Sequence, residues 1–169
     1  IEKSLSFNPN DPEAHYWRAR ACARDLFATT RLRGVWDFPG AIELEPAVGD
    51  PTLTAEFRAR ALAGLEAAAK TGSNWKISHR MPVVEGLRHL LSGRPRDAAS
   101  ALQQALEPSE DDPEVRVLFG LALYLDSKFQ QASEECVKRF SSTAGRLARV
   151  IYARANLALE NFDRGLDAL

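Results

Sequence analysis

The sequence predicts an all-α protein built from stacked pairs of helices, and three observations lead to this expectation. The first is composition. The 169 residues include 26 Ala and 21 Leu but only 8 Val, 4 Ile and 6 Thr, so residues that favour helices greatly outnumber the β-branched residues that favour strands. The second is that Gly and Pro cut the chain into segments of helix length. The third is a spacing of 33 to 34 residues that recurs in the second half.

Clusters of Gly and Pro set the expected helix boundaries. They lie at residues 9–12, 39–40, 46–51, 93–95 and 108–113, and such residues favour turns and helix ends over helix interiors. The helices that we expect between them span residues 13–27, 54–70, 80–92, 96–107, 113–126, 129–140, 144–160 and 162 to the end.

Residues 28–50 carry the weakest helical signal. The stretch 33–40 has two aromatic residues and two glycines, so we expect an inserted loop or a bent second helix that ends at 41–45. Ala19 and Gly86 are 67 residues apart, close to two repeat periods, yet Pro46 to Pro51 falls where the first helix of the intervening unit should have its middle. We therefore expect this unit to be irregular or broken.

The helix expected at residues 54–70 is read as a single longer helix. Thr54 suits its N-terminal cap and Gly72 its end. We expect its second arm to be missing or replaced by residues 75–80.

Small residues recur at the repeat spacing. A small residue in the first helix of a pair lets its partner helix approach closely, and one in the second helix is expected to do the same against the next pair. The first-helix residues are Gly86, Gly120 and Ala153, and the second-helix residues are Ala98, Ala132 and Gly165.

This pattern resembles the tetratricopeptide repeat (TPR) family, whose unit is a helix, a turn and a helix with a small residue in each arm. Residues 81–105, 112–136 and 152–165 carry the resemblance. It implies a right-handed superhelix of antiparallel helix pairs, a TPR-like α-solenoid, irregular in its N-terminal part. We expect one domain over 1–169, with degenerate repeats and a loop near 28–50 in residues 1–78, and about two and a half regular repeats in 79–169. Since residues 1–7 are typical of a helix end, we also expect a fragment of a longer protein.

The resemblance also implies where a partner binds. First helices line the concave surface of such a superhelix, and helical spacing from the small residue selects the residues that face it. Nearly all of them are apolar, so we expect a non-catalytic interaction module that binds an apolar or amphipathic helical peptide of a protein partner, unless neighbouring helices or residues 28–50 already cover this face. The expected contact residues are Val83, Leu87, Leu90, Val117, Leu121, Tyr124, Leu125, Val150 and Arg154.

The alternative is a structural scaffold or an oligomerisation segment of a larger multidomain protein. The last helix presents an apolar face at Leu166 and Leu169 that needs a cover. Under this alternative the chain self-associates through its exposed repeat ends.

Charge and motif content argue against other classes of function. The net charge is −1, which disfavours nucleic-acid binding, and the longest apolar run, 117–125, is too short for membrane insertion. Three scattered histidines and the absence of metal or phosphate-binding motifs lead us to expect no metal, no cofactor and no enzymatic activity. Only Arg154 and Arg20 are placed to meet an anion, so capture of a partner's C-terminal carboxylate is disfavoured.

Two cysteines lie far apart in the sequence. Cys22 and Cys136 each fall inside an apolar helical pattern, and we expect buried, reduced thiols rather than a disulfide. The sequence leaves the cell compartment open, with the cytoplasm favoured.

Overall fold

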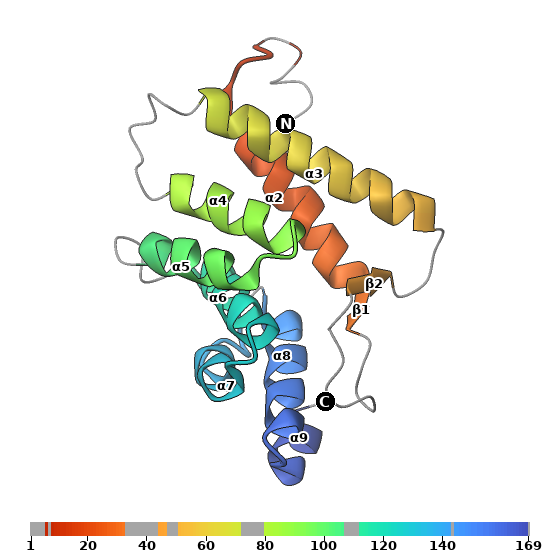
Figure 1. The fold of residues 1–169 in the computed structure, drawn as a ribbon, viewed down its shortest axis with the longest axis vertical. Coiled ribbons are helices and arrows are strands. Elements are labelled where there is room, and N and C mark those ends of the chain that lie inside the picture. Colours follow the sequence, from red (N-terminus) through yellow and green to blue (C-terminus); the bar gives the residue numbers. More distant parts are fainter. Residues whose placement is uncertain are drawn as a thin grey trace.

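The computed structural model describes residue 6 and residues 8–32, 44–46, 51–71, 80–106, 112–142 and 144–168. These residues are helical apart from one short two-stranded ribbon, which confirms the all-α expectation. The helices follow one another along the long axis of the molecule (Figure 1). They are α2 (Pro12–Thr29), α3 (Pro51–Thr71), α4 (Arg80–Leu91), α5 (Pro95–Leu106), α6 (Pro113–Leu125), α7 (Phe129–Val137), α8 (Gly145–Ala158) and α9 (Phe162–Asp167).

Each helix packs mainly against its neighbours in the chain. The pairs α2 and α3, α4 and α5, α6 and α7, and α8 and α9 are in contact, and so are α3 with α4, α5 with α6, and α7 with α8. Contacts also join α6 to α8 directly. The described helices therefore form a linear succession of pairs, each resting on the next.

The helix boundaries agree with the expected ones to within three residues. The start of α6 shows the local reason. The Asp112 side chain accepts hydrogen bonds from the backbone N–H groups of Glu114 and Val115, and Pro113 occupies the first helical turn, where no N–H is needed. Between α4 and α5, Gly93 has a φ of +70°, a conformation that favours glycine.

The small residues of the first helices lie where helices cross closely. A Cβ on Gly86 would stand 2.5 Å from Cγ of Leu102 in α5, and one on Gly120 would stand 2.6 Å from Sγ of Cys136 in α7. The second-helix expectation was wrong in one respect. A Cβ on Gly165 would approach the carbonyl oxygen of Ala153 in α8, so this small residue faces the first helix of its own pair and not the next pair.

The N-terminal half differs from the sequence-based expectation in its pairing. Helix α3 was expected to lack a second arm, but it is the second arm of α2, because the two helices pack together. A Cβ on Gly64 of α3 would lie 3.2 Å from Cβ of Ala19 in α2. The 67 residues between Ala19 and Gly86 thus span one pair rather than two. They do so because α2 and α3 are long, with 18 and 21 residues, and an insertion separates them.

The insertion carries the ribbon. Strand β1 (Thr30–Leu32) runs antiparallel to β2 (Leu44–Pro46), with Thr30 opposite Pro46 and Leu32 opposite Leu44. A bent helix ending at 41–45 is therefore wrong, since residues 44 and 45 are extended. Residues 33–43 lie outside the described part of the chain.

One cluster of buried side chains extends through the stack. It begins at Tyr16 and Ala19 in α2 and reaches Ile151 and Ala155 in α8. Among the described helices, none is both long and apolar enough to cross a membrane.

Candidate functional site

The residues expected to contact a partner lie mostly in this core. Six of the nine are at most 7% exposed, and the remaining three, Leu125, Val150 and Arg154, are half-buried. These residues are therefore mostly covered by neighbouring helices, which is the exception that the sequence analysis allowed for. The prediction that a partner contacts it stays a prediction. The six buried residues are Val83, Leu87, Leu90, Val117, Leu121 and Tyr124.

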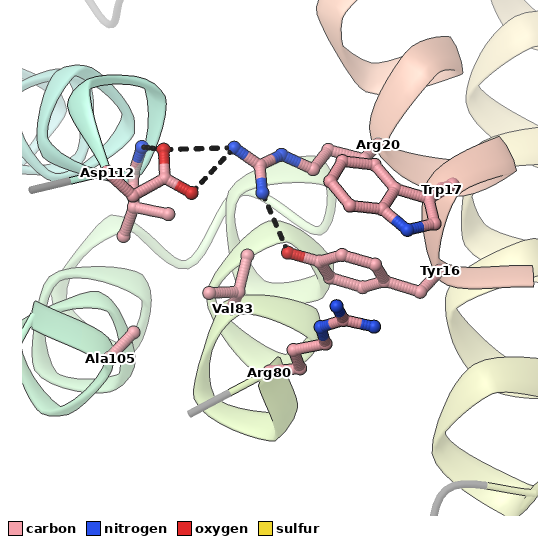
Figure 2. Close-up of a pocket in the computed structure, with 8 residues that line it drawn as sticks. Tyr16, Trp17, Arg20, Arg80, Val83, Ala105 and Asp112 are labelled. Carbon is pink, nitrogen blue, oxygen red and sulfur yellow. Dashed lines mark hydrogen bonds and ion pairs between the residues drawn. The ribbon is translucent and has the colours of Figure 1, made fainter. Parts of the chain in front are cut away.

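A cavity of ≈ 180 Å³ lies between the first helix pair and the next two pairs (Figure 2). Of the nine residues expected to contact a partner, Val83 lines this cavity. Trp17 is 41% exposed, whereas Tyr16 and Arg20 beside it are buried. The lining residues are Tyr16, Trp17, Arg20, Arg80, Val83, Ala105, Asp112 and Val115.

Arg20 connects α2 to the start of α6. Its Nη2 donates to both carboxylate oxygens of Asp112, at 3.1 and 3.0 Å, and its Nη2 and Nε donate to one oxygen of Glu114, at 2.7 and 3.1 Å. Its Nη1 donates to the Tyr16 hydroxyl at 2.9 Å (Figure 2). A single guanidinium therefore joins residues more than 90 positions apart, from the first helix pair to the third.

The charges around Arg20 keep it ionised. Burial works against the charged guanidinium, but Tyr16, Glu114 and Asp112 outweigh this effect and raise the pKa of Arg20 further. Burial also raises the pKa of the Tyr16 hydroxyl, although Arg20 opposes that shift. From the sequence we expected that Arg20 could bind an anion of a partner. Here its donors are already bound to two carboxylates of the same chain.

Arg80 of α4 completes the cluster, with its side chain only 15% exposed. Its Nη1 lies 2.7 Å from Oε1 of Glu13, and its guanidinium carbon lies 5.4 and 5.7 Å from the ring centroids of Tyr16 and Trp17, within cation–π range. Trp17 also donates from Nε1 to Glu13 at 3.3 Å. Hydrogen bonds from Arg80 and Trp17 lower the pKa of the Glu13 carboxyl. An indole and a guanidinium therefore line the cavity, and the Glu13 carboxylate binds both of them from outside the lining.

A second polar contact lies at the other end of α6. The hydroxyl of Tyr124 and the guanidinium of Arg154 in α8 lie close enough to interact electrostatically. Burial lowers the pKa of Arg154, with Tyr124 opposing the shift, and burial raises the pKa of Tyr124. Of the two residues expected to meet an anion, Arg154 therefore also has a partner within the chain.

A buried hydrogen bond joins the last two pairs. Asn156 of α8 donates from Nδ2 to the Ser133 hydroxyl of α7 at 2.9 Å, and Asn156 is 2% exposed. In the sequence, Asn156 falls only within residues 152–165, one of the ranges that carry the repeat resemblance. No pattern in the sequence around Asn156 indicates that its hydrogen-bond partner lies 23 residues earlier in the chain.

Cys136 is the expected buried, free thiol. Burial, with a smaller effect of Glu135, raises its pKa to about 12. The thiol therefore stays protonated at neutral pH and is a poor nucleophile. The side chain of Cys22 lies outside what the structure describes.

Sequence analysis missed the Arg20 cluster as a site. Tyr16 and Arg20 stand four residues apart on one helix face, and the spacing Asp112-x-Glu114 opens another helix. Each pattern is common by itself, and nothing in the sequence indicates that the two meet in space.

Within the described residues, no three His, Cys, Asp or Glu side chains gather in a way that could hold a metal ion. Comparison with protein-family models, with curated proteins and with solved structures finds no match to this chain in any of the three.

Proposed function

We propose that this chain is a non-catalytic protein-interaction module with the architecture of a TPR-like α-solenoid, a right-handed superhelix of antiparallel helix pairs. Two findings support the proposal. Helices pack in consecutive pairs along the described chain, and the small residues that recur at 33 to 34 positions stand at close helix crossings. Stacked pairs of this kind provide extended surfaces that bind other proteins.

The cavity beside α2, α4 and α6 is where we place the partner. The observation that carries this choice is a cavity that the exposed Trp17 borders and that both polar groups (Arg20, Arg80, Asp112) and apolar side chains (Val83, Ala105, Val115) line. An amphipathic helical peptide suits such a site, because a side chain with an apolar stem and a polar tip meets both the apolar and the polar groups that line the cavity.

The walls of this cavity are held in place before a partner arrives. Arg20 fixes Tyr16 and Asp112 relative to each other through three hydrogen bonds. A pre-organised site loses less conformational entropy on binding. The half-buried residues Leu125, Val150 and Arg154 are placed to extend the contact surface along α6 and α8.

The burial of Leu87 and Leu121 decides which variants test the proposal. A glutamate at either position would place a charge in the core and unfold the chain before it reported on binding. Variants of the residues that line the cavity are better probes, because they change the space that a partner would fill. Since Ala105 is also buried in the core, the stability of its variant is measured beside its binding.

The test is selection of binders from a displayed library of amphipathic helical peptides, followed by measurement of Kd by fluorescence anisotropy. Ala105→Leu fills the cavity and Arg80→Ala removes the guanidinium from its lining. We expect each to weaken binding by about tenfold, roughly 1.4 kcal/mol.

Arg94→Ala is the matched control, because Arg94 lies in an exposed turn, with only a long contact to Asp97. Circular dichroism verifies that all variants keep the same helicity. Selected peptides that bind wild type, Ala105→Leu and Arg80→Ala equally would place the interaction elsewhere and contradict the proposed site.

A structural scaffold is the second candidate function. The observation that favours it is the exposure of two large apolar side chains in the last helix, Phe162 and Leu166 of α9. Exposed apolar patches commonly mark sites of association.

A further inference from the structure

The connection between α7 and α8 lies in the longest stretch of the chain without an acidic residue. Residues 136–159 hold five basic residues and no acidic one, although the whole chain has 22 basic and 23 acidic residues. Two of the five directly follow α7, and two more lie in the first two turns of α8. We call these four residues the basic turn, and they are Lys138, Arg139, Arg146 and Arg149.

The backbone of this connection is compact. The N–H and the hydroxyl of Ser142 both donate to the carbonyl oxygen of Arg139, at 3.0 and 2.7 Å, and the N–H of Gly145 donates to the carbonyl oxygen of Ser142 at 2.9 Å. A Cβ on Gly145 would collide with the carbonyl oxygen of Phe140. The start of α8 therefore rests on the end of α7, which brings the two halves of the basic turn to the same end of these helices.

An aromatic contact holds the guanidinium of Arg149. Its central carbon lies 5.7 Å from the ring centroid of Phe140, within cation–π range, and that ring packs edge-on against Tyr152 at 5.2 Å. Arg149 is exposed, and so is Arg146, which lies three residues earlier on the same face of α8. A stacked guanidinium keeps the N–H groups at its edge for hydrogen bonds. The first turns of α8 thus present two neighbouring cations to solvent.

The acidic residues that precede the basic turn are engaged by other groups. Glu135 pairs with Arg116 of α6 at 3.2 Å, and Glu134 accepts a hydrogen bond from Gln130 at 2.8 Å. No carboxylate of the described residues lies within ion-pair distance of the basic turn. The Nε atom of Arg139 is also a buried donor without a hydrogen-bond acceptor in the described part of the chain. The protein therefore leaves the charge of the basic turn without a neutralising partner of its own.

We propose that the basic turn binds an acidic segment of a protein partner. Three of its four cations are guanidiniums, which bind carboxylates through two parallel hydrogen bonds. The net charge of −1 favours a short acidic segment over a long polyanion. A nucleic acid or an anionic membrane would extend over surface that is not basic, whereas a short segment contacts the basic turn alone. None of the four residues lines the cavity, so this surface is separate from the proposed peptide site.

The experiment is a titration of the 169-residue chain into a fluorescently labelled oligoglutamate peptide, followed by anisotropy. An oligoglutamine peptide of the same length reports any binding that needs no charge. We expect saturable binding of the oligoglutamate peptide alone, and it should weaken as salt is added. Arg146→Gln with Arg149→Gln is expected to raise its Kd at least about tenfold. The same double variant should bind cavity peptides with unchanged Kd, which separates this inference from the proposed function.

Arg94→Gln with Arg96→Gln is the matched control, because both residues are exposed and lie on another helix pair. It changes the net charge by the same amount, and we expect it to raise the Kd of the oligoglutamate peptide less than about twofold. Melting curves verify the fold of each variant. If loss of the contact between Arg149 and Phe140 destabilises the first variant, Lys138→Gln with Arg146→Gln gives the same test.

Three results would overturn the proposal. The first is an oligoglutamate peptide that does not bind wild type, and the second is equal weakening by the variants of the basic turn and by the control. The third is tighter binding of phosphatidylserine vesicles or of a single-stranded DNA oligonucleotide than of the peptide, lost in the variants of the basic turn. The surface would then serve a membrane or a nucleic acid and not an acidic protein segment.

Discussion

At the scale of single residues, the crossing of α6 and α7 is limited by one atom pair. A Cβ on Gly120 would lie 2.6 Å from Sγ of Cys136, while the next nearest atoms stand at 3.7 and 3.9 Å, which is ordinary contact. The sulfur atom alone therefore determines that glycine is required here. Cys136 is fully buried, so it has little room to move away.

The effect of Gly120→Ala on the free energy of unfolding is predicted to change sign when Cys136 is replaced by alanine. In wild type the added methyl group overpacks the crossing, at a cost of about 1–3 kcal/mol that exceeds the roughly 1 kcal/mol gained from the better helix propensity of alanine. In a Cys136→Ala background the sulfur is gone, so the substitution should stabilise the protein by up to about 1 kcal/mol. Urea denaturation of the four proteins measures this coupling.

Gly93→Ala serves as the control for that cycle. Its φ of +70° makes alanine unfavourable, but no atom lies within 4 Å of the added Cβ. Its cost, on the order of 1 kcal/mol, should be the same with Cys or Ala at position 136. An equal loss for Gly120→Ala in both backgrounds would contradict the role given to the sulfur.

At the scale of elements, the start of α6 combines two functions in one carboxylate. Asp112 caps the helix by accepting from two backbone N–H groups and also receives Arg20. Asparagine caps a helix about as well as aspartate, but it carries no charge. Substitution with asparagine and with alanine therefore separates the cap from the ion pair.

Asp112→Asn is predicted to destabilise the protein by less than Asp112→Ala, with a difference of about 1 kcal/mol for the lost cap. The cost of Asp112→Asn itself should fall to near zero in an Arg20→Met background, because the charge that it pairs with is gone. Thermal melts of these variants give the comparison. Equal losses for the asparagine and alanine variants would mean that the cap contributes nothing measurable.

The elements themselves were predictable because their ends carry local signals. Pro113 after Asp112 begins a helix whatever the fold, and the turn at Gly93 ends one. The pairing of α3 with α2 was not predictable from spacing. Because both helices are long and a ribbon is inserted between them, the distance from Ala19 to Gly86 is close to two repeat periods although it spans one pair. Strands β1 and β2 are three residues each, too short for an alternating pattern to identify.

At the scale of the whole molecule, contacts between distant parts of the chain decide what the sequence could not. Spacing selected Leu87 and Leu121 as residues on one side of their helices, but it does not say how many neighbours cover that side. The Arg20 contacts with Asp112 and Glu114 span more than 90 residues, and no local pattern encodes them. Spacing therefore identified apolar residues on one side of each helix, but it predicted neither that neighbouring helices bury them nor the cavity beside them.

Arg20 also changes how the stack is expected to unfold. In a stack of repeats each pair is stabilised mainly by its neighbours, so end pairs open first. Arg20 adds a direct bond between the first and third pairs, so opening of α2 and α3 must also break ion pairs with α6. The α8 and α9 end has no corresponding bond to α4 or α5 among the interactions of the described residues.

Arg20→Met is predicted to uncouple the first pair from the third. It keeps most of the side-chain volume but leaves Asp112 and Glu114 without their cation, and because both carboxylates are about a quarter exposed, water offsets part of the cost. We expect a loss of about 1–3 kcal/mol, below the usual 3–5 kcal/mol for breaking a fully buried pair. Hydrogen exchange followed by mass spectrometry should show faster exchange in α2 and α3 with α8 unchanged.

Arg60→Met is the matched control, since Arg60 pairs with Glu56 on the exposed surface of α3. Its effect should stay within about 0.5 kcal/mol, with no change in exchange of either end. Uniformly faster exchange through all helices in Arg20→Met protein would contradict the uncoupling, because it would mean that the stack opens as one unit. Faster exchange confined to α2 and α3 would instead show that a single side chain sets the stability of one end of the stack.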